Sequence, residues 1–100
     1  MKPFREALAD IMAIKGLEQL ELAVTTDVSQ SAISLYLAGK RVPRPSTIAK
    51  LATGLDVSPE YFIEYRRWRL HRLLDEWIEE DEDQVELLLA RADARRDLSR

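Results

Sequence analysis

The chain has no cysteine, a single histidine and no long apolar run, and each shortage removes a class of protein. Without cysteine it has neither a disulfide framework nor a thiolate metal site, which fits a reducing compartment. His71 alone cannot form a histidine-rich metal site. No stretch reaches the roughly 18 uninterrupted apolar residues of a membrane span, and charges within the N-terminal apolar pattern argue against a signal peptide. We expect a soluble, cytoplasmic protein without bound metal, cofactor or membrane contact.

The composition is that of a helix-rich globular protein, but its charge is unevenly placed. The 100 residues are 46% hydrophobic and 33% charged, with a net charge of −3. Residues 1–50 carry 7 basic and 5 acidic groups, and residues 64–72 carry 4 basic and 1 acidic group. Residues 75–83 then hold 7 acids and no base. This asymmetry says more about binding partners than the net charge does.

Apolar residues recur at helical spacing along the chain, and no segment alternates with period two, so we expect an all-α fold. The first helix is predicted to begin at Pro3 and to end at Gly16. The second covers about 19–25, and the third covers about 30–38 behind a Ser29 cap, with Ile33, Tyr36 and Leu37 as its buried stripe.

Three further helices are predicted in the second half of the chain. The fourth is expected to begin at Ser46 or Thr47, after a basic loop that contains two prolines. The fifth is expected to begin at Pro59, behind a Ser58 cap, and to continue past residue 78. A capping box of Asp83 and Glu86 predicts the start of the sixth.

Residues 16–62 resemble the Cro/phage-repressor type of helix-turn-helix, the xenobiotic-response-element (XRE) family. The similarity lies in "GLEQLELA", "DVSQSAISLYLAGKRVP" and "PSTIAKLATGLDVSPEYF", in this order and spacing. It implies a five-helix DNA-binding domain over residues 1–63 and leaves residues 64–100 as a helical extension. Three residues depart from the family pattern. Glu18 replaces a capping Ser or Thr, so we expect a weaker start of the second helix. Asp27 and Asp56 replace glycines, so we expect mild backbone strain or local side-chain hydrogen bonding at both aspartates.

The resemblance also implies which residues meet DNA. In this family the third helix enters the major groove, with its N-terminal residues against the base edges. Carried over to this sequence, the base-contacting residues are Gln30, Ser31, Ser34 and Leu35. Glutamine can bind adenine through two hydrogen bonds, and leucine can contact the thymine methyl group. The phosphate-contacting residues are Gln19, Ser29, Lys40, Arg41 and Arg44.

The stretch "EYRRWRLHRLLDEWIEEDED" predicts a helix with a basic first half and an acidic second half. Acids near a helix C-terminus oppose the macrodipole, so we expect compensation from elsewhere. A hairpin with the last helix would bring basic groups together, whereas two antiparallel copies pair each basic half with the partner's acidic half. We therefore expect a homodimer or higher oligomer, with a monomer that has a self-folded tail as the alternative. The predicted interface residues are Leu70, Leu73, Leu74 and Trp77.

These features favour a sequence-specific DNA-binding transcriptional regulator, a repressor that binds a near-palindromic operator as a dimer. The alternative is a protein-interaction module or an antitoxin, in which the acidic and aromatic C-terminal helices bind a protein partner. The sequence shows no arrangement of nucleophile, base and phosphate cradle, so we do not expect an enzyme.

Overall fold

The structure, a computed structural model, describes residues 2–80 and 82–98. The described residues form helices without any β-strand, so the all-α prediction is confirmed. The chain forms two compact units, Met1–Trp68 and Arg69–Arg100. Within the described part, no helix combines the length and the apolar character needed to cross a membrane. The elements are α1 (Phe4–Lys15), α2 (Gln19–Thr26), α3 (Gln30–Leu37), α4 (Pro45–Leu55), the 3₁₀ helix η1 (Pro59–Tyr61), α5 (Ile63–Glu80) and α6 (Glu82–Leu98).

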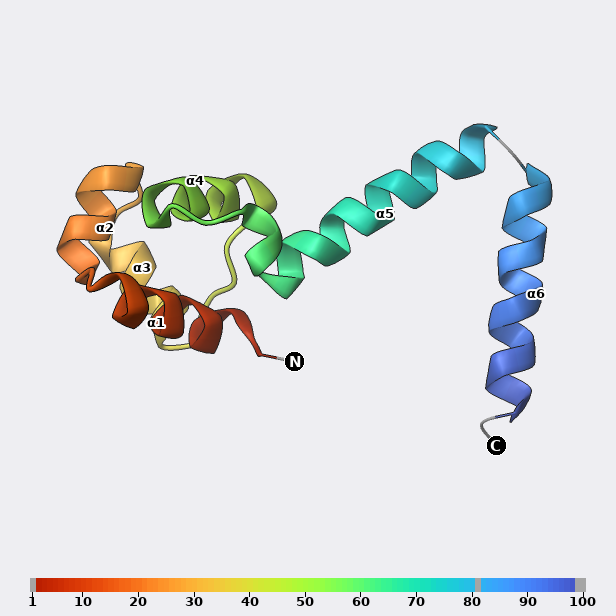
Figure 1. Ribbon diagram of the computed structural model, residues 1–100, viewed down its shortest axis with the longest axis horizontal. Helices are drawn as coiled ribbons and strands as arrows, with labels where there is room; N and C mark the ends of the chain where they lie inside the picture. Colours follow the sequence, from red (N-terminus) through yellow and green to blue (C-terminus); the bar gives the residue numbers. More distant parts are fainter. Residues whose placement is uncertain (1, 81, 99–100) are drawn as a thin grey trace. The chain divides into compact units, whose positions relative to one another are not determined.

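The first unit is built around one apolar core, to which α1, α2, α3 and α4 each turn one face (Figure 1). α2 contacts both α3 and α4, and α1 contacts the same two helices. The predicted stripe of α3 is confirmed for Ile33, which is fully buried, and for Tyr36, whereas Leu37 is only half-buried against the core. Complete burial of a large apolar side chain stabilises the fold by about 1.5–3 kcal/mol. The largest fully buried side chains are those of Leu8, Leu22, Ile33, Ile48, Leu51, Leu55 and Phe62.

Several of these helices end at a residue with left-handed backbone conformation. Asp56 has a φ of 56°, its N–H donates to the Thr53 oxygen at 3.1 Å, and the Val57 N–H donates to the Ala52 oxygen at 3.0 Å. This pattern is the Schellman motif, which satisfies the last free carbonyls of a helix. Asp27, at the end of α2, has a φ of 58°. Of the two alternatives predicted for the aspartates, the positive φ values bear out backbone strain, since non-glycine residues seldom adopt positive φ.

Two early helix boundaries differ from the prediction by one or two residues. Pro3 is the N-terminal cap of α1 and not its first residue, and its carbonyl oxygen accepts bonds from the N–H groups of Glu6 and Ala7 at 3.1 Å each. α4 begins at Pro45, before the predicted Ser46, because a proline lacking an N–H suits the first position of a helix.

The later boundaries also require correction. The predicted fifth helix is interrupted, because η1 ends at Tyr61 and Phe62 is extended, with a φ of −94° and a ψ of 128°. This extended residue is fully buried, and its ring centroid lies 4.7 Å from that of Phe4. Burial of this ring in the core therefore separates η1 from α5. α6 begins at Glu82, so Asp83 lies inside its first turn, where an acid favours the helix dipole, and not at the position that precedes the helix.

A close approach of α2 and α4 was not predicted. A Cβ atom on Gly54 would lie 2.2 Å from the Cγ2 atom of Thr26, which is far inside van der Waals contact. Thr26 is buried, and its hydroxyl donates to the Leu22 carbonyl oxygen at 2.6 Å. Only a residue without a side chain fits at position 54 while Thr26 keeps this place.

Candidate nucleic-acid interface

The turn between α2 and α3 is held by the backbone and by one apolar side chain. Asp27 takes the left-handed conformation, and its N–H donates to the Ala23 oxygen at 3.1 Å. Val28 follows and is buried in the core, with 8% of its surface exposed. α3 begins two residues later at Gln30. The direction of α3 is therefore set by the core and not by its exposed side chains.

The first turn of α3 presents polar groups to solvent. The Ser29 hydroxyl oxygen accepts the Ala32 N–H at 3.1 Å, so the predicted cap is confirmed. This bond uses a lone pair of the hydroxyl and leaves its proton for donation. Gln30, Ser31 and Ser34 are all exposed. These three predicted base-contacting residues therefore share the accessible surface of α3, while Leu35 is half-buried.

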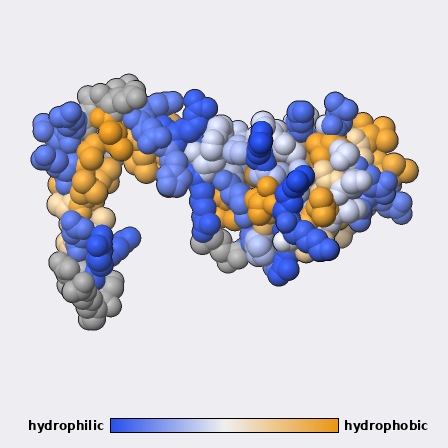
Figure 2. Space-filling view, turned by 180° about the vertical axis from the view of Figure 1, so that it is seen from behind, coloured by the Kyte–Doolittle hydropathy of each residue, from blue (hydrophilic) through white to orange (hydrophobic). Residues whose placement is uncertain are grey.

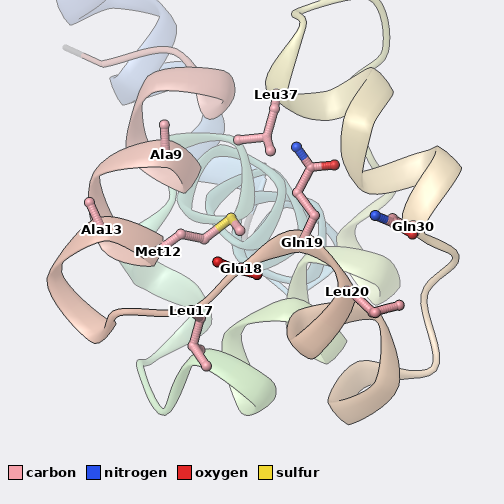
Figure 3. A pocket seen from close by; sticks show the side chains of 9 residues that line it. All are labelled: Ala9, Met12, Ala13, Leu17, Glu18, Gln19, Leu20, Gln30 and Leu37. Atoms are coloured by element: carbon pink, nitrogen blue, oxygen red, sulfur yellow. The ribbon is translucent and has the colours of Figure 1, made fainter.

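A hydrogen bond connects the two helices of the motif. The Ser34 hydroxyl donates to the side-chain oxygen of Gln19 at 2.6 Å. Gln19 is the half-buried first residue of α2, and its contact with Ser34 was not predicted. Figure 3 shows the Gln19 side chain extending from the start of α2 toward α3, at the edge of a shallow hollow that Gln30 also lines.

An acid also lies at this hollow. Glu18 precedes α2 and lines the same depression as Gln19 and Gln30 (Figure 3). Its side chain makes no capping hydrogen bond, as predicted for a residue that replaces Ser or Thr. Position 18 therefore leaves the first N–H groups of α2 without a side-chain acceptor and places a negative charge beside Gln19.

The basic loop after α3 is fixed at its start and in its middle. Gly39 has a φ of 73°, its N–H donates to the Tyr36 oxygen at 3.1 Å, and the Lys40 N–H donates to the Leu35 oxygen at 3.0 Å. This left-handed turn, which favours glycine, sets where the loop leaves α3. Pro43 is buried and holds the middle of the loop. The three predicted phosphate-contacting cations of the loop, Lys40, Arg41 and Arg44, are exposed.

A further cation, which was not predicted from the sequence, lies beside this loop. A Cβ atom on Gly39 would lie 2.9 Å from Cδ of Arg5 and 3.3 Å from a terminal guanidinium nitrogen, so the Arg5 side chain rests against the Gly39 backbone. Arg5 belongs to α1 and is exposed. Helical periodicity marks Arg5 only as a surface residue, and no local signal connects it with a loop 34 residues away.

In the second unit, the predicted interface residues of α5 are largely open to solvent. Leu70 is 56% exposed, Leu73 52% and Trp77 38%, whereas Leu74 is half-buried. The spacing of these four residues places them on one face of α5. Apolar side chains also lie at the surface along α6 (Figure 2), where Leu87 and Leu89 are exposed.

Comparison with known proteins identifies the α2–turn–α3 arrangement. The helix-turn-helix family model matches residues 8–62, which is more than half of the chain. The chain belongs to the Cro/C1-type (XRE) helix-turn-helix family. This XRE protein is therefore a DNA-binding regulator of transcription, and the matched region includes α2 and α3.

A solved structure supports the same assignment. The XRE protein is similar to the crystal structure of the restriction-modification controller protein C.AhdI from Aeromonas hydrophila, with 33% sequence identity and a TM-score of 0.56. The match covers 58% of this chain and 88% of the controller protein. A search of curated proteins found no match.

Proposed function

We propose that this XRE protein is a repressor that binds a near-palindromic operator as a dimer, in the cytoplasm. α3 of each subunit enters the major groove of one half-site. The observation that carries this proposal is the exposed polar first turn of α3 above the buried Ile33 and Tyr36. A rigid helix with short hydrogen-bonding side chains at its tip suits the reading of base edges.

Base recognition falls to the exposed and half-exposed side chains of α3. Gln30 offers a donor and an acceptor that match the edge of adenine, and Ser31 and Ser34 offer hydroxyl groups. Leu35 supplies an apolar surface for a thymine methyl group. Each matched base contact is worth about 1–3 kcal/mol of discrimination against the wrong base.

Adhesion to the DNA backbone falls to groups on both sides of α3. Gln19 and the Ser29 hydroxyl donate to phosphate oxygens at the start of α2 and α3, and Lys40, Arg41 and Arg44 supply positive charge after α3. Each cation that neutralises a phosphate adds about 0.9 to the slope of log affinity against log salt concentration. These contacts fix the position of the protein on DNA but do not read sequence.

Dimerisation through α5 brings two copies of α3 to one operator. The apolar face of Leu70, Leu73, Leu74 and Trp77 is exposed or half-buried in the single chain and would be covered by the same face of a second copy. In an antiparallel pair the basic first half of α5 meets the acidic second half of its partner. A two-fold dimer of this kind reads half-sites about 34 Å apart, one turn of the DNA helix.

Selection of bound sequences from random duplexes tests the proposal. A dimeric regulator enriches a near-palindromic consensus, with half-sites separated by a whole number of helical turns. A single unpaired half-site would contradict the dimer, and failure to enrich any sequence would contradict specific recognition.

A second candidate function is capture of a protein partner by the C-terminal helices. It is favoured by the exposure of Leu87 and Leu89, at 47% and 59%, on a helix beyond the matched family region. Binding of a protein partner that survives Gln30→Ala and Lys40→Ala but is lost on Leu89→Asp would support it. The comparison requires that Leu89→Asp leaves the oligomeric state and the operator affinity unchanged.

A further inference from the structure

The bond between Ser34 and Gln19 connects a predicted base contact to a predicted phosphate contact. It joins the first residue of α2 to the fifth residue of α3 across 15 positions of the chain, with an O···O distance of 2.6 Å. This distance lies at the short end of the normal range for O–H···O bonds. Ser34 follows Gln30 by one helical turn, so both residues stand on the side of α3 nearest the start of α2.

This hydrogen bond determines which donor and acceptor groups of the two side chains remain available. A serine hydroxyl has one proton, and Ser34 gives that proton to the Gln19 oxygen. The lone pairs that remain on Ser34 can only accept hydrogen bonds. Gln19, whose oxygen is occupied, keeps the two N–H groups of its amide for donation.

A phosphate contact would reinforce this direction. Phosphate oxygens only accept hydrogen bonds, so a glutamine that binds phosphate must turn its NH₂ group toward the DNA. Its oxygen then faces inward, where it accepts the proton of Ser34. The orientation in the free protein is therefore already the orientation that phosphate binding requires.

We infer that Ser34 is a specificity-determining acceptor, set in that state by Gln19, and that it selects adenine or cytosine in each half-site. In the major groove only the N6 amino group of adenine and the N4 amino group of cytosine donate hydrogen bonds, whereas guanine and thymine present acceptors. This inference rests on the proposed function, because it requires α3 to lie in the major groove.

Removal of Gln19 tests the inference. First, Ser34→Ala locates the base position whose preference depends on Ser34. At that position the wild-type protein favours adenine or cytosine over guanine or thymine by about fivefold or more, the lower limit for one good base contact. Gln19→Ala releases the Ser34 proton, so the hydroxyl can also donate to guanine or thymine. The preference at this one position then falls to about twofold or less, and the affinity for all sequences falls with it.

Lys40→Ala is the matched control, because it removes a phosphate contact that does not touch Ser34. It weakens binding to all sequences alike and leaves the preference at the Ser34 position intact. Ser34→Thr keeps the hydroxyl and therefore keeps the preference. Circular dichroism of each variant verifies that the fold is retained.

Three results separate the inference from the proposed function. A Gln19→Ala variant that binds more weakly but keeps the full preference overturns the coupling and leaves the regulator proposal standing. A Ser34→Ala variant with an unchanged preference at every position shows that Ser34 reads no base and overturns the inference. A wild-type protein without any sequence preference overturns both.

Discussion

The hydroxyl of Ser34 donates to the side-chain oxygen of Gln19 at 2.6 Å and so connects α3 to the first residue of α2. The family resemblance gave these residues separate roles, one at a base and one at a phosphate. In the proposed function, their direct bond makes contact with the DNA backbone and recognition of a base depend on each other. We therefore expect a substitution at one of the two residues to alter the DNA contact of the other.

Gln30→Ala is predicted to relax the preference at one base position of each half-site. The Gln30 side chain is exposed at the tip of α3, so truncation should leave the free energy of unfolding nearly unchanged. Discrimination at that base falls by about 1–3 kcal/mol. Competition binding with duplexes substituted at each position measures the effect. A uniform loss over all sequences would contradict base reading by this residue.

Glu18→Ser is predicted to stabilise the protein and to strengthen DNA binding. Serine can accept the free N–H groups at the start of α2, which Glu18 does not, and a cap of this kind is worth about 1 kcal/mol. The substitution also removes a negative charge beside Gln19. Urea unfolding and a titration with operator DNA measure the two effects. Glu21→Ser is the control, since it removes an acid from the first turn without supplying a cap, and it should not stabilise the fold.

Gly54→Ala is predicted to lower the free energy of unfolding by about 1–3 kcal/mol, the usual cost of overpacking. The added Cβ atom meets the Cγ2 atom of Thr26 at 2.2 Å. Thr26→Ser removes that methyl group and keeps the hydroxyl that binds the Leu22 oxygen. In the Thr26→Ser background, Gly54→Ala should therefore cost much less. Additive effects in this double-mutant cycle would contradict the contact.

The features that could be predicted from the sequence are those that depend on residues close together in the chain. The burial of Ile33 and Tyr36, the Ser29 cap and the backbone strain at Asp27 were predicted because each depends on residues within one or two helical turns. Those features were enough to locate α2 and α3, and with them the polar surface of α3.

The features that the sequence analysis missed all join distant parts of the chain. The bond from Ser34 to Gln19, the contact of Arg5 with Gly39 and the fit of Gly54 against Thr26 each depend on how two helices approach one another. The interruption of the predicted fifth helix at Phe62 has the same origin, because the Phe62 ring packs in the core beside Phe4. Periodicity within one helix carries no information about such contacts.

Arg69→Glu and Glu76→Arg are each predicted to weaken the dimer about tenfold or more, and their combination is predicted to restore it. The two exposed residues lie seven positions apart on the same side of the α5 stripe, so in an antiparallel pair Arg69 faces the partner's Glu76. Each single reversal sets like charges against each other twice per dimer. Sedimentation velocity at micromolar concentration measures the change.

Asp75→Lys is the matched control for this charge swap. Asp75 is exposed on the opposite side of α5 from the apolar stripe, so reversal of its charge should leave dimerisation unchanged. A double variant that stays as weak as the single variants would contradict the antiparallel arrangement. A wild-type protein that sediments as a monomer would contradict the dimer itself.

The proposed function requires the first turn of α3 to face the bases of DNA. Amide chemical shifts of the full chain, recorded during titration with the duplex that the protein selects, test it most directly. We predict the largest changes at residues 29–35, with a second group at residues 40–44 and at Gln19. Changes confined to α5 and α6, with residues 29–35 unaffected, would contradict the account.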